Sequence, residues 1–453
     1  MASSSDSAQV RWSSRWLFVL AAAGSAVGLG NIWRFPYITG ENGGGAFVLI
    51  YLACIALVGV PVMMAEVLLG RAGRQSPIHT MRRLARDHKR SPSWVLLGWL
   101  GILAGFLILS YYTVIAGWAL HYLWLMASGS FQGISAGGAS STFESFTANP
   151  WLLLFWHTVF MGATVWIVAR GVVKGLEAAI RWFMPMLFLL LFVLVGYACT
   201  TDGFQQGFDF MFGINWDAVT PNTVLVAMAH AFFTLSVGMG AIMAYGAYIP
   251  PTTSIAGTVG IIAGLDTLVS LGAGLVVFPI VFANGLEPGQ GPGLMFVTIP
   301  LAFGHMPLGA LFGSLFFVLV AFAAITSTIS LCEPALAYLV EEYNAKRARV
   351  AVSFGVLSWL LGVGTVLSFN VWSGVHIVGE KTFFDTVDFL SQSVMLPVGG
   401  MLIALFAGWA LPFSVVGDQL GLAKPWVAFL WKTVVGVVAP AGVFAVLVSN
   451  VLA

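Results

Sequence analysis

The residues of this chain best suited to chemistry are small oxygen-bearing side chains beside two copies of a glycine motif. The motif reads Val-Gly-x-Gly and occupies residues 27–30 and 237–240. The side chains that flank it are Ser25, Asn31, Thr234 and Ser236. Oxygen ligands suit a hard cation. Because a hydroxyl in a membrane helix commonly bonds a carbonyl of its own helix, these residues indicate a cation site as a cluster rather than singly.

Both copies of the motif interrupt helices that are otherwise apolar and of membrane length. Closely spaced glycines are poor helix formers and leave backbone groups free, which hydrocarbon tolerates only where the break lines a cavity or is buried in protein. The freed amides suit a carboxylate and the freed carbonyls suit cations. Close helix packing is the alternative explanation. Two breaks at matching places in two halves favour the binding site of a secondary transporter.

The composition is that of a polytopic membrane protein. Of the 453 residues, 59% are hydrophobic and 8% are charged, against about 25% charged in soluble domains. Apolar runs predict eleven spans, at 16–38, 45–70, 94–126, 151–169, 178–199, 222–248, 255–283, 308–340, 350–371, 385–412 and 427–452. The three cysteines and the net charge of +1 indicate no disulfide framework, thiolate metal site or nucleic-acid partner. No nucleophile–base pair or phosphate-binding loop points to an enzyme.

Lysine and arginine are distributed unevenly between the predicted loops. The loop after the second span is strongly basic, and so are the segments after the fourth span, with Arg170 and Lys174, and after the eighth, with Lys346, Arg347 and Arg349. The alternate loops 127–150, 200–221 and 284–305 contain neither residue type. The positive-inside rule therefore places the N-terminus in the cytoplasm, and eleven spans place the C-terminus outside.

The glycine breaks fall in the first and sixth spans, which divides the chain into two halves of five helices. An odd number of helices per half predicts an inverted repeat, formed by residues 16–199 and 222–412. Residues 1–15 are then a cytoplasmic N-terminal segment, and 427–452 form an additional eleventh helix.

Charged residues inside the predicted spans are few, and each costs at least about 2.5–3.5 kcal/mol when it is unpaired. The main ones are Arg34, Glu41, Glu66, Asp266, Glu333 and Asp388. Arg34 and Asp388 lie in the outer third of spans one and ten, where a structural ion pair and a gate are both reasonable explanations. We expect His230 to be a buried packing residue rather than a proton shuttle.

Read together, these motifs resemble a known family. Residues 24–36, GSAVGLGNIWRFP, followed by ENGGGAF at 41–47, are similar to the first helix of the neurotransmitter:sodium symporter family. FFTLS at 232–236 resembles its broken sixth helix, and Thr326-Ser327 its eighth. The resemblance, which extends from about Trp12 to the end of span ten, implies an all-α polytopic protein of the prokaryotic cell (inner) membrane. Its fold would be the LeuT-type 5+5 inverted repeat with helices 1 and 6 broken and eleven transmembrane helices.

The resemblance implies two sodium ions and one substrate bound near mid-membrane. The first sodium site would comprise Ala26, Asn31, Thr234 and Asp266, with the substrate carboxylate able to complete it. The second would comprise Gly24, Val27, Ala323, Thr326 and Ser327. Every ligand in both sets is an oxygen, as the residue types alone predict.

The resemblance also implies a pocket for a hydrophobic L-amino acid. Its lining would be Ser25, Ala26, Gly28, Gly30, Ile108, Tyr112, Phe233, Thr234, Ser236, Met239, Ser327 and Leu331. Monoamine carriers of the family have an aspartate at the position of Gly28, so glycine leaves room for the carboxylate of the substrate, which would meet the Gly28 and Gly30 amides and the Tyr112 hydroxyl. The adaptable Met239 predicts a range from aliphatic to aromatic side chains.

Gate residues follow from the same resemblance. Arg34 and Asp388 would form an outer ion pair above a lid of Tyr112 and Phe233. Trp12, Tyr248 and Glu341 match inner-gate positions. The matching N-terminal arginine is replaced by Gln9, so Arg11 or Arg15 would have to substitute for it.

Two further positions bear on ion coupling. Gly175 and Pro185 match the Gly-x9-Pro element of the family, where unwinding admits water to the second sodium site, although an ordinary proline kink is an equal alternative. Chloride-dependent members have Tyr, Ser and Gln at the positions of Tyr51, Ser270 and His230, and Asn at that of Asp266. Because the Asp266 carboxylate already supplies negative charge, we expect chloride-independent transport.

The sequence therefore predicts a symporter that couples two sodium ions to the import of one hydrophobic L-amino acid by alternating access. A proton-coupled carrier of the same architecture, with Glu66 or Glu333 as the relay, is an alternative. A non-transporting amino acid sensor is another. A channel fits less well, because an aromatic lid favours occlusion over a continuous pore.

Overall fold

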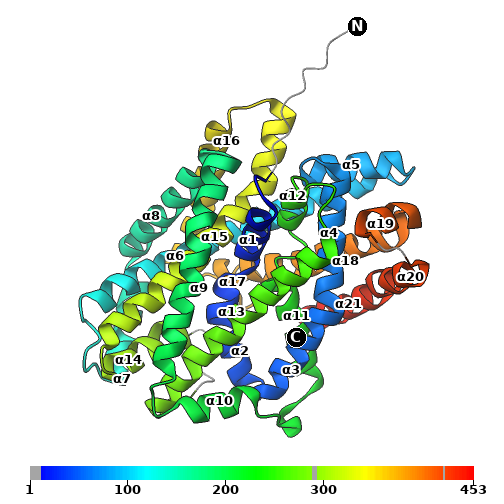
Figure 1. The fold of residues 1–453 in the computed structure, drawn as a ribbon. Coiled ribbons are helices and arrows are strands. Elements are labelled where there is room, and N and C mark those ends of the chain that lie inside the picture. Colours follow the sequence, from blue (N-terminus) through cyan, green and yellow to red (C-terminus); the bar gives the residue numbers. More distant parts are fainter. Residues whose placement is uncertain (1–11, 288–292, 422–423, 453) are drawn as a thin grey trace.

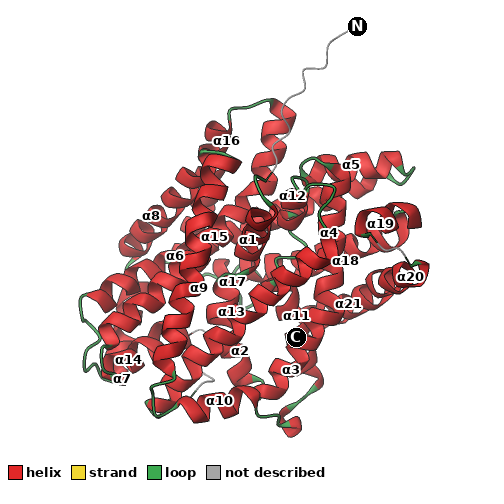
Figure 2. Cartoon of the chain, viewed as in Figure 1, coloured by secondary structure: helices red, strands yellow, loops and turns green. Residues whose placement is uncertain are grey.

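The structure is a computed structural model that describes residues 12–287, 293–421 and 424–452. The regular elements within these ranges are helices joined by short loops (Figure 2). Nine helices of the described chain are long and apolar enough to cross a membrane. Trp151 and Trp182 expose 78% and 75% of their surface, which suits a protein whose sides face lipid rather than water.

The first five spans coincide closely with the predicted ones, and several of them contain π-helical turns. Their elements are α1 (Arg15–Ala26), η1 (Gly30–Arg34) and α2 (Phe35–Glu41), then α3 (Gly45–Cys54), η2 (Ile55–Gly59) and α4 (Val60–Gly73), then η3 (Pro92–Trp94) with α6 (Val95–Ala127), then α8 (Pro150–Ala169), and finally η4 (Val172–Glu177) with α9 (Ala178–Ala198).

The remaining spans repeat this mixture of straight and interrupted helices. Their elements are α11 (Pro221–Thr234) and α12 (Ala241–Gly246), α13 (Ile255–Ala283), α15 (Gly309–Tyr343), α16 (Arg347–Ser368), then α17 (Phe383–Asp388), η7 (Phe389–Met395), α18 (Leu396–Leu405) and η8 (Phe406–Ala410), and finally α20 (Pro425–Thr433), η9 (Val434–Val438) and α21 (Ala439–Leu452).

The predicted count of eleven spans is consistent with this fold when each broken helix is counted once. The helices Arg15–Ala26 and Gly30–Glu41 are bent by 50° at the first glycine motif. Helices α11 and α12, separated by residues 235–240, are each too short to span a bilayer alone and together supply the eleventh span.

Short helices occupy loops that the sequence analysis left without structure. They are α5 (Pro77–Asp87), α7 (Ala136–Thr147), α10 (Phe204–Phe212), η5 (Trp216–Ala218), η6 (Leu294–Thr298) with α14 (Ile299–His305), and α19 (Phe413–Leu420). The basic helix α5 lies at one end of the molecule, and α7, α10 and α14 lie at the opposite end (Figure 1). The fold therefore separates the basic loops from those without lysine or arginine.

The interior is organised around α1, which packs against both α13 and α15, while α15 runs along α6. Small residues allow these close approaches. A Cβ added to Gly24 of α1 would lie 3.2 Å from Cβ of Thr326 in α15, and one added to Gly105 of α6 would lie 3.2 Å from the Leu331 carbonyl. This packing holds the first glycine break against hydroxyl-bearing residues of α15.

Candidate functional site

The two helix breaks face each other at the centre of the molecule. α1 ends at Ala26, and Val27 has an extended backbone with φ −68° and ψ 112°. In the second break Gly238 and Gly240 adopt φ values of 97° and 76°, a region that side chains disfavour. The Ser236 hydroxyl donates to the Ser25 carbonyl at 2.7 Å, which joins one break to the other.

A buried carboxylate stabilises the second break. Glu66 of α4 accepts hydrogen bonds from the Gly238 amide at 3.0 Å and the Met243 amide at 3.3 Å. Met243 is the third residue of α12, and the first N–H groups of a helix lack helical partners, whereas Gly238 lies in the break before this helix. The Glu66 carboxylate thus caps the second break by accepting hydrogen bonds from two of its backbone amides.

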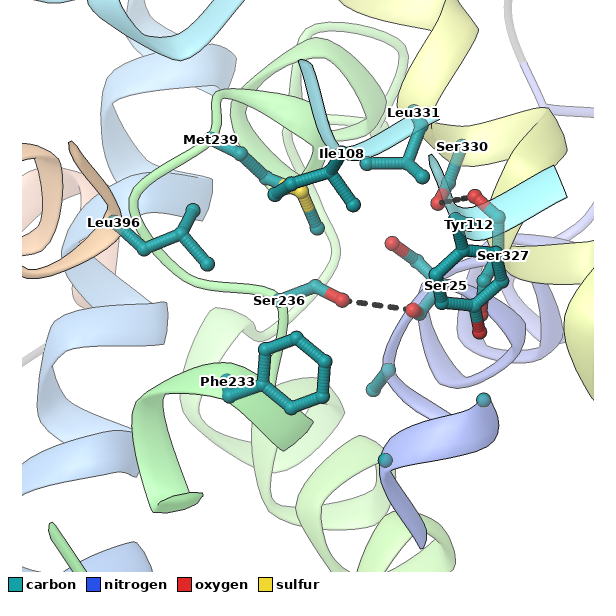
Figure 3. A pocket seen from close by; sticks show the side chains of 13 residues that line it. Ser25, Ile108, Tyr112, Phe233, Ser236, Met239, Ser327, Ser330, Leu331 and Leu396 are labelled. Atoms are coloured by element: carbon teal, nitrogen blue, oxygen red, sulfur yellow. Dashed lines mark hydrogen bonds between the residues drawn. The ribbon is translucent and has the colours of Figure 1, made fainter. Parts of the chain in front are cut away.

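A cavity lies between the breaks (Figure 3). Its lining includes every predicted substrate residue except one: Ser25, Ala26, Gly28, Gly30, Ile108, Tyr112, Phe233, Ser236, Met239, Ser327 and Leu331. Thr234 instead points to Asp266. Ser330 and Leu396 also line the cavity and were missed, since a serine and a leucine on apolar helices look like packing residues.

The cavity has a polar end and an apolar end. Figure 3 shows Ser25, Tyr112 and Ser327 together on one side, with Ile108, Met239 and Leu396 arranged away from them. The Ser25 hydroxyl is buried and has no hydrogen-bond partner in the described chain. Such an unpaired group is costly, so this end suits a polar ligand.

Close contacts at the polar end explain the glycines of the first break. A Cβ on Gly28 would lie 2.5 Å from the Ser327 hydroxyl oxygen and 2.7 Å from that of Tyr112. The Gly28 amide donates to Asn31 Oδ1 at 2.9 Å, and the Leu29 amide donates to the Tyr112 hydroxyl at 2.9 Å. Leu29 is a contact that the sequence did not predict, because its side chain gives no indication of what its amide does.

The Phe233 ring and a series of hydrogen-bonded polar side chains close the cavity on the side of α17. A Cβ on Gly30 would lie 2.7 Å from the Phe233 ring, and the Arg34 guanidinium carbon lies 4.9 Å from the centroid of that ring. Arg34 donates to Gln392, which donates to Asp388. The expected direct pair between Arg34 and Asp388 is thus replaced by a bridge through Gln392, which lies one helical turn after Asp388.

Three of the four residues predicted for the first sodium site, Asn31, Thr234 and Asp266, are in mutual contact. Thr234 donates to both Asp266 carboxylate oxygens, at 2.9 and 3.0 Å. Asn31 Nδ2 lies within 3.2 Å of four oxygens, those of Thr234 and Ser270 and two of Asp266. An amide nitrogen has only two hydrogens, so it can donate to only two of these four oxygens. The cluster of oxygens, which includes the buried Asp266 carboxylate, therefore fits a cation.

The residues predicted for the second sodium site join α1 to α15. The Ser327 hydroxyl donates to the Val27 carbonyl at 3.2 Å, and the Thr326 hydroxyl donates to the Ala323 carbonyl at 3.0 Å. Gly24 lies beside Thr326. This set consists of neutral carbonyl and hydroxyl oxygens, which hard monovalent or divalent cations prefer.

The inner-gate residues belong to two separate networks. Trp12 donates through Nε1 to the Tyr245 carbonyl at 3.2 Å, and Tyr248 donates to Glu333 at 3.2 Å. Glu333 also forms an ion pair with Arg347.

Glu341 lies in the second of these networks, which consists of Ser76, His79 and Glu341 and, among the described residues, shares no hydrogen bond with Trp12 or Tyr248. It accepts from the Ser76 amide at 2.9 Å and from His79 at 2.9 Å. Gln9 and Arg11 lie outside the described residues, and Arg15 begins α1. The expectation that one arginine near the N-terminus completes the gate therefore stays a prediction. Arg347, read from the sequence as a loop charge, is half-buried and pairs with the fully buried Glu333.

The Gly-x9-Pro element contacts the start of α1. Gly175 lies within the π-helical turn η4, and Pro185 lies inside α9. Glu177, at the end of η4, is buried and accepts from the Ser13 amide at 2.9 Å and the Ser13 hydroxyl at 2.7 Å. Neither Ser13 nor Glu177 was predicted, because nothing in their local sequence indicates that they pair.

The residues at the family's chloride positions are also adjacent. Tyr51 and Ser270 hydroxyl oxygens lie 3.3 Å apart. The His230 ring stacks on Phe35 at 5.9 Å between centroids, and its two nitrogens have no hydrogen-bond partner among the described residues. Its packing role agrees with the expectation for this histidine.

Comparison with known proteins is consistent with this geometry. The model of the sodium:neurotransmitter symporter family matches residues 9–133 and 140–453. A sodium-dependent transporter of Bacillus subtilis, YhdH, is 41% identical over 416 residues, which cover 92% of this chain and 90% of that protein. A sodium-dependent transporter of Haemophilus influenzae is 30% identical over 446 residues, 97% of each chain.

A solved structure has the same fold over almost the whole chain. The crystal structure of MhsT in complex with L-phenylalanine matches with a TM-score of 0.90 and 44% identity, and it covers 97% of this chain and 99% of that one. The chain therefore belongs to the sodium:neurotransmitter symporter family, whose members are membrane transporters rather than enzymes.

Proposed function

We propose that this protein imports hydrophobic L-amino acids by sodium-coupled symport, with two sodium ions per substrate and no requirement for chloride. One observation carries the proposal: the two facing helix breaks enclose a cavity with a polar end and an apolar end. An amino acid has the same division between its charged backbone groups and its side chain. The MhsT complex with L-phenylalanine supports this assignment by similarity.

The polar end would hold the charged groups of the substrate. Its carboxylate approaches Tyr112 and the amides of the first break, where a partly positive helix end favours an anion. The amide of Asn31 is assigned with its oxygen toward Gly28. Rotation of that amide by half a turn would turn its oxygen to the first sodium ion and release the Gly28 amide to the carboxylate, so that sodium and substrate favour each other's binding.

The apolar end would hold the substrate side chain among Ile108, Met239, Leu331 and Leu396. Burial of apolar surface yields roughly 25 cal/mol per Å², which favours large side chains over small ones. Met239 is unbranched and adapts to different shapes. This combination supports a range from leucine-like to aromatic substrates.

Sodium would drive accumulation through its own gradient. Two sodium ions that cross about 100 mV release about 4.6 kcal/mol, and a tenfold concentration gradient adds about 1.4 kcal/mol for each ion. The total of roughly 7 kcal/mol supports about a 10⁵-fold accumulation of substrate. The end that bears α5 is then cytoplasmic in a cell membrane, in agreement with the positive-inside rule.

The test is uptake of a panel of labelled amino acids into proteoliposomes, with and without a sodium gradient. We expect sodium-dependent uptake of L-phenylalanine and L-leucine, and none of glutamate or lysine. Thr234→Val should abolish both sodium and substrate binding, whereas the matched control Thr433→Val should not, because the Thr433 hydroxyl bonds only the Phe429 carbonyl of its own helix. Uptake that follows a pH gradient without sodium would overturn the proposal, and so would binding without flux.

A further inference from the structure

Two further cavities lie on the outer side of the helix bundle, apart from the substrate site. The larger is a groove between α8 and α16 with an empty volume of about 1160 Å³. The smaller, about 520 Å³, lies between α8, η4 and α9. Trp166 and Arg170 line both cavities. The two cavities therefore lie on either side of Trp166 and share Arg170 in their lining.

The larger groove is shaped for an apolar chain. From Thr158 to Arg170 it runs ~18 Å along α8, at 1.5 Å per residue, which is comparable with one leaflet of a hydrocarbon core of about 30 Å. Within its wall, Trp359 Nε1 donates to the Thr158 hydroxyl at 2.9 Å, so these two polar groups satisfy each other. A Cβ added to Gly162 in its wall would meet no atom within 4 Å, so the groove is open there.

Unneutralised positive charge lies where the two cavities meet. The Arg170 guanidinium carbon stacks 3.6 Å from the centroid of the Trp166 ring. Arg170 and the neighbouring Lys174 are exposed and form no ion pair with any residue that the structure describes.

Four acidic residues of the same end are already engaged. Glu177 accepts from Ser13, and Glu333 pairs with Arg347. Glu341 and Glu342 both contact His79. Because no described residue pairs with Arg170 or Lys174, we expect the anion that neutralises them to come from outside the described chain.

We propose that this surface binds one anionic diacyl phospholipid. One acyl chain occupies the α8–α16 groove, the other occupies the cavity beside α9, and the phosphate lies at Arg170 and Lys174. The lipid thus straddles Trp166. Its second chain contacts Gly175 and Ala178, the residues around the π-helical turn η4.

Native mass spectrometry of the purified full chain tests the proposal, with dioleoyl phosphatidylglycerol or phosphatidylcholine added to the micelles. We expect the wild type to retain one phosphatidylglycerol in preference to phosphatidylcholine. Arg170→Gln should weaken phosphatidylglycerol retention about fivefold, the effect of one basic residue at an anionic surface, and leave phosphatidylcholine unchanged. Gly162→Leu fills the open groove without a clash and should reduce the retention of both lipids.

Matched controls keep the test specific. Lys424→Gln removes a positive charge outside the two cavities, and Gly196→Leu adds a side chain at another open site on α9; both should retain lipid as the wild type does. Phosphatidylglycerol retention equal to that of the wild type in both Arg170→Gln and Gly162→Leu would overturn the proposal. So would Gly162→Leu turning dimers into monomers with lipid retention unchanged, because the groove would then hold a second copy of the chain.

Discussion

Replacement of Glu66 by glutamine is expected to weaken substrate binding although Glu66 does not line the cavity. The Glu66 carboxylate accepts two backbone hydrogen bonds, from Gly238 and Met243. Glutamine offers one oxygen, and its NH₂ group faces the second amide as a donor against a donor. A hydrogen bond to a charged acceptor contributes about 1.5–3 kcal/mol. Relief from burying a charge offsets part of this loss, which leaves a net cost of about 2 kcal/mol.

That cost falls on the conformation of the second break, which shapes the cavity. A loss of about 2 kcal/mol corresponds to about a thirtyfold rise in the dissociation constant. Equilibrium binding of labelled L-phenylalanine at saturating sodium measures it, with Glu41→Gln as the control for loss of one carboxylate. We expect the second sodium site, built on α1 and α15, to change less. Substrate affinity within twofold of the wild type in Glu66→Gln would refute the capping role of this carboxylate.

Three further outcomes are expected. Asp266→Asn should make uptake depend on chloride, because a fixed negative charge near the first sodium site is lost; uptake unchanged in gluconate would contradict this. Arg347→Gln should lower the free energy of unfolding by about 3–5 kcal/mol, since it leaves the Glu333 charge buried without its partner, and Glu333→Gln in the same chain should restore most of it in thermal melting. Gln392→Leu should speed dissociation of L-phenylalanine at least about tenfold by removing a hydrogen bond to a charged group, and an unchanged rate in a chase experiment would exclude Gln392 as part of the gate.

The breaks and the oxygen-bearing residues beside them were predictable from local patterns, whereas most of the cavity lining was predicted from the family resemblance, which assigns it position by position. The closely spaced glycines of Val-Gly-x-Gly are poor helix formers, so the motif predicts a break. The hydroxyls beside it indicate a cation site when they are taken as a group. Contacts between distant elements were not predictable in the same way. Gln392 lies between Arg34 and Asp388 only because α17 and η7 bring it there, and the Arg347–Glu333 pair depends on how α16 returns against α15.

The helix count illustrates the same limit. Hydropathy identifies apolar segments long enough to cross a membrane and therefore found the spans. It did not identify helices such as α5 and α10, which are short and not uniformly apolar. Their stability comes from packing on the spans, which a local pattern does not contain.

The pairing of Ser13 with Glu177 makes the start of α1 and the turn η4 mechanically dependent on each other. The Ser13 amide and hydroxyl both donate to Glu177 and hold the two segments together. Loss of these two hydrogen bonds would leave the Glu177 carboxylate, which lies close to Gly175 in the chain, without them. Opening toward the basic end would have to break both hydrogen bonds, so we expect α1 and η4 to move together. A chain built this way is expected to resist movement of either element alone, and loss of the Ser13–Glu177 contact is expected to let the start of α1 move independently of η4.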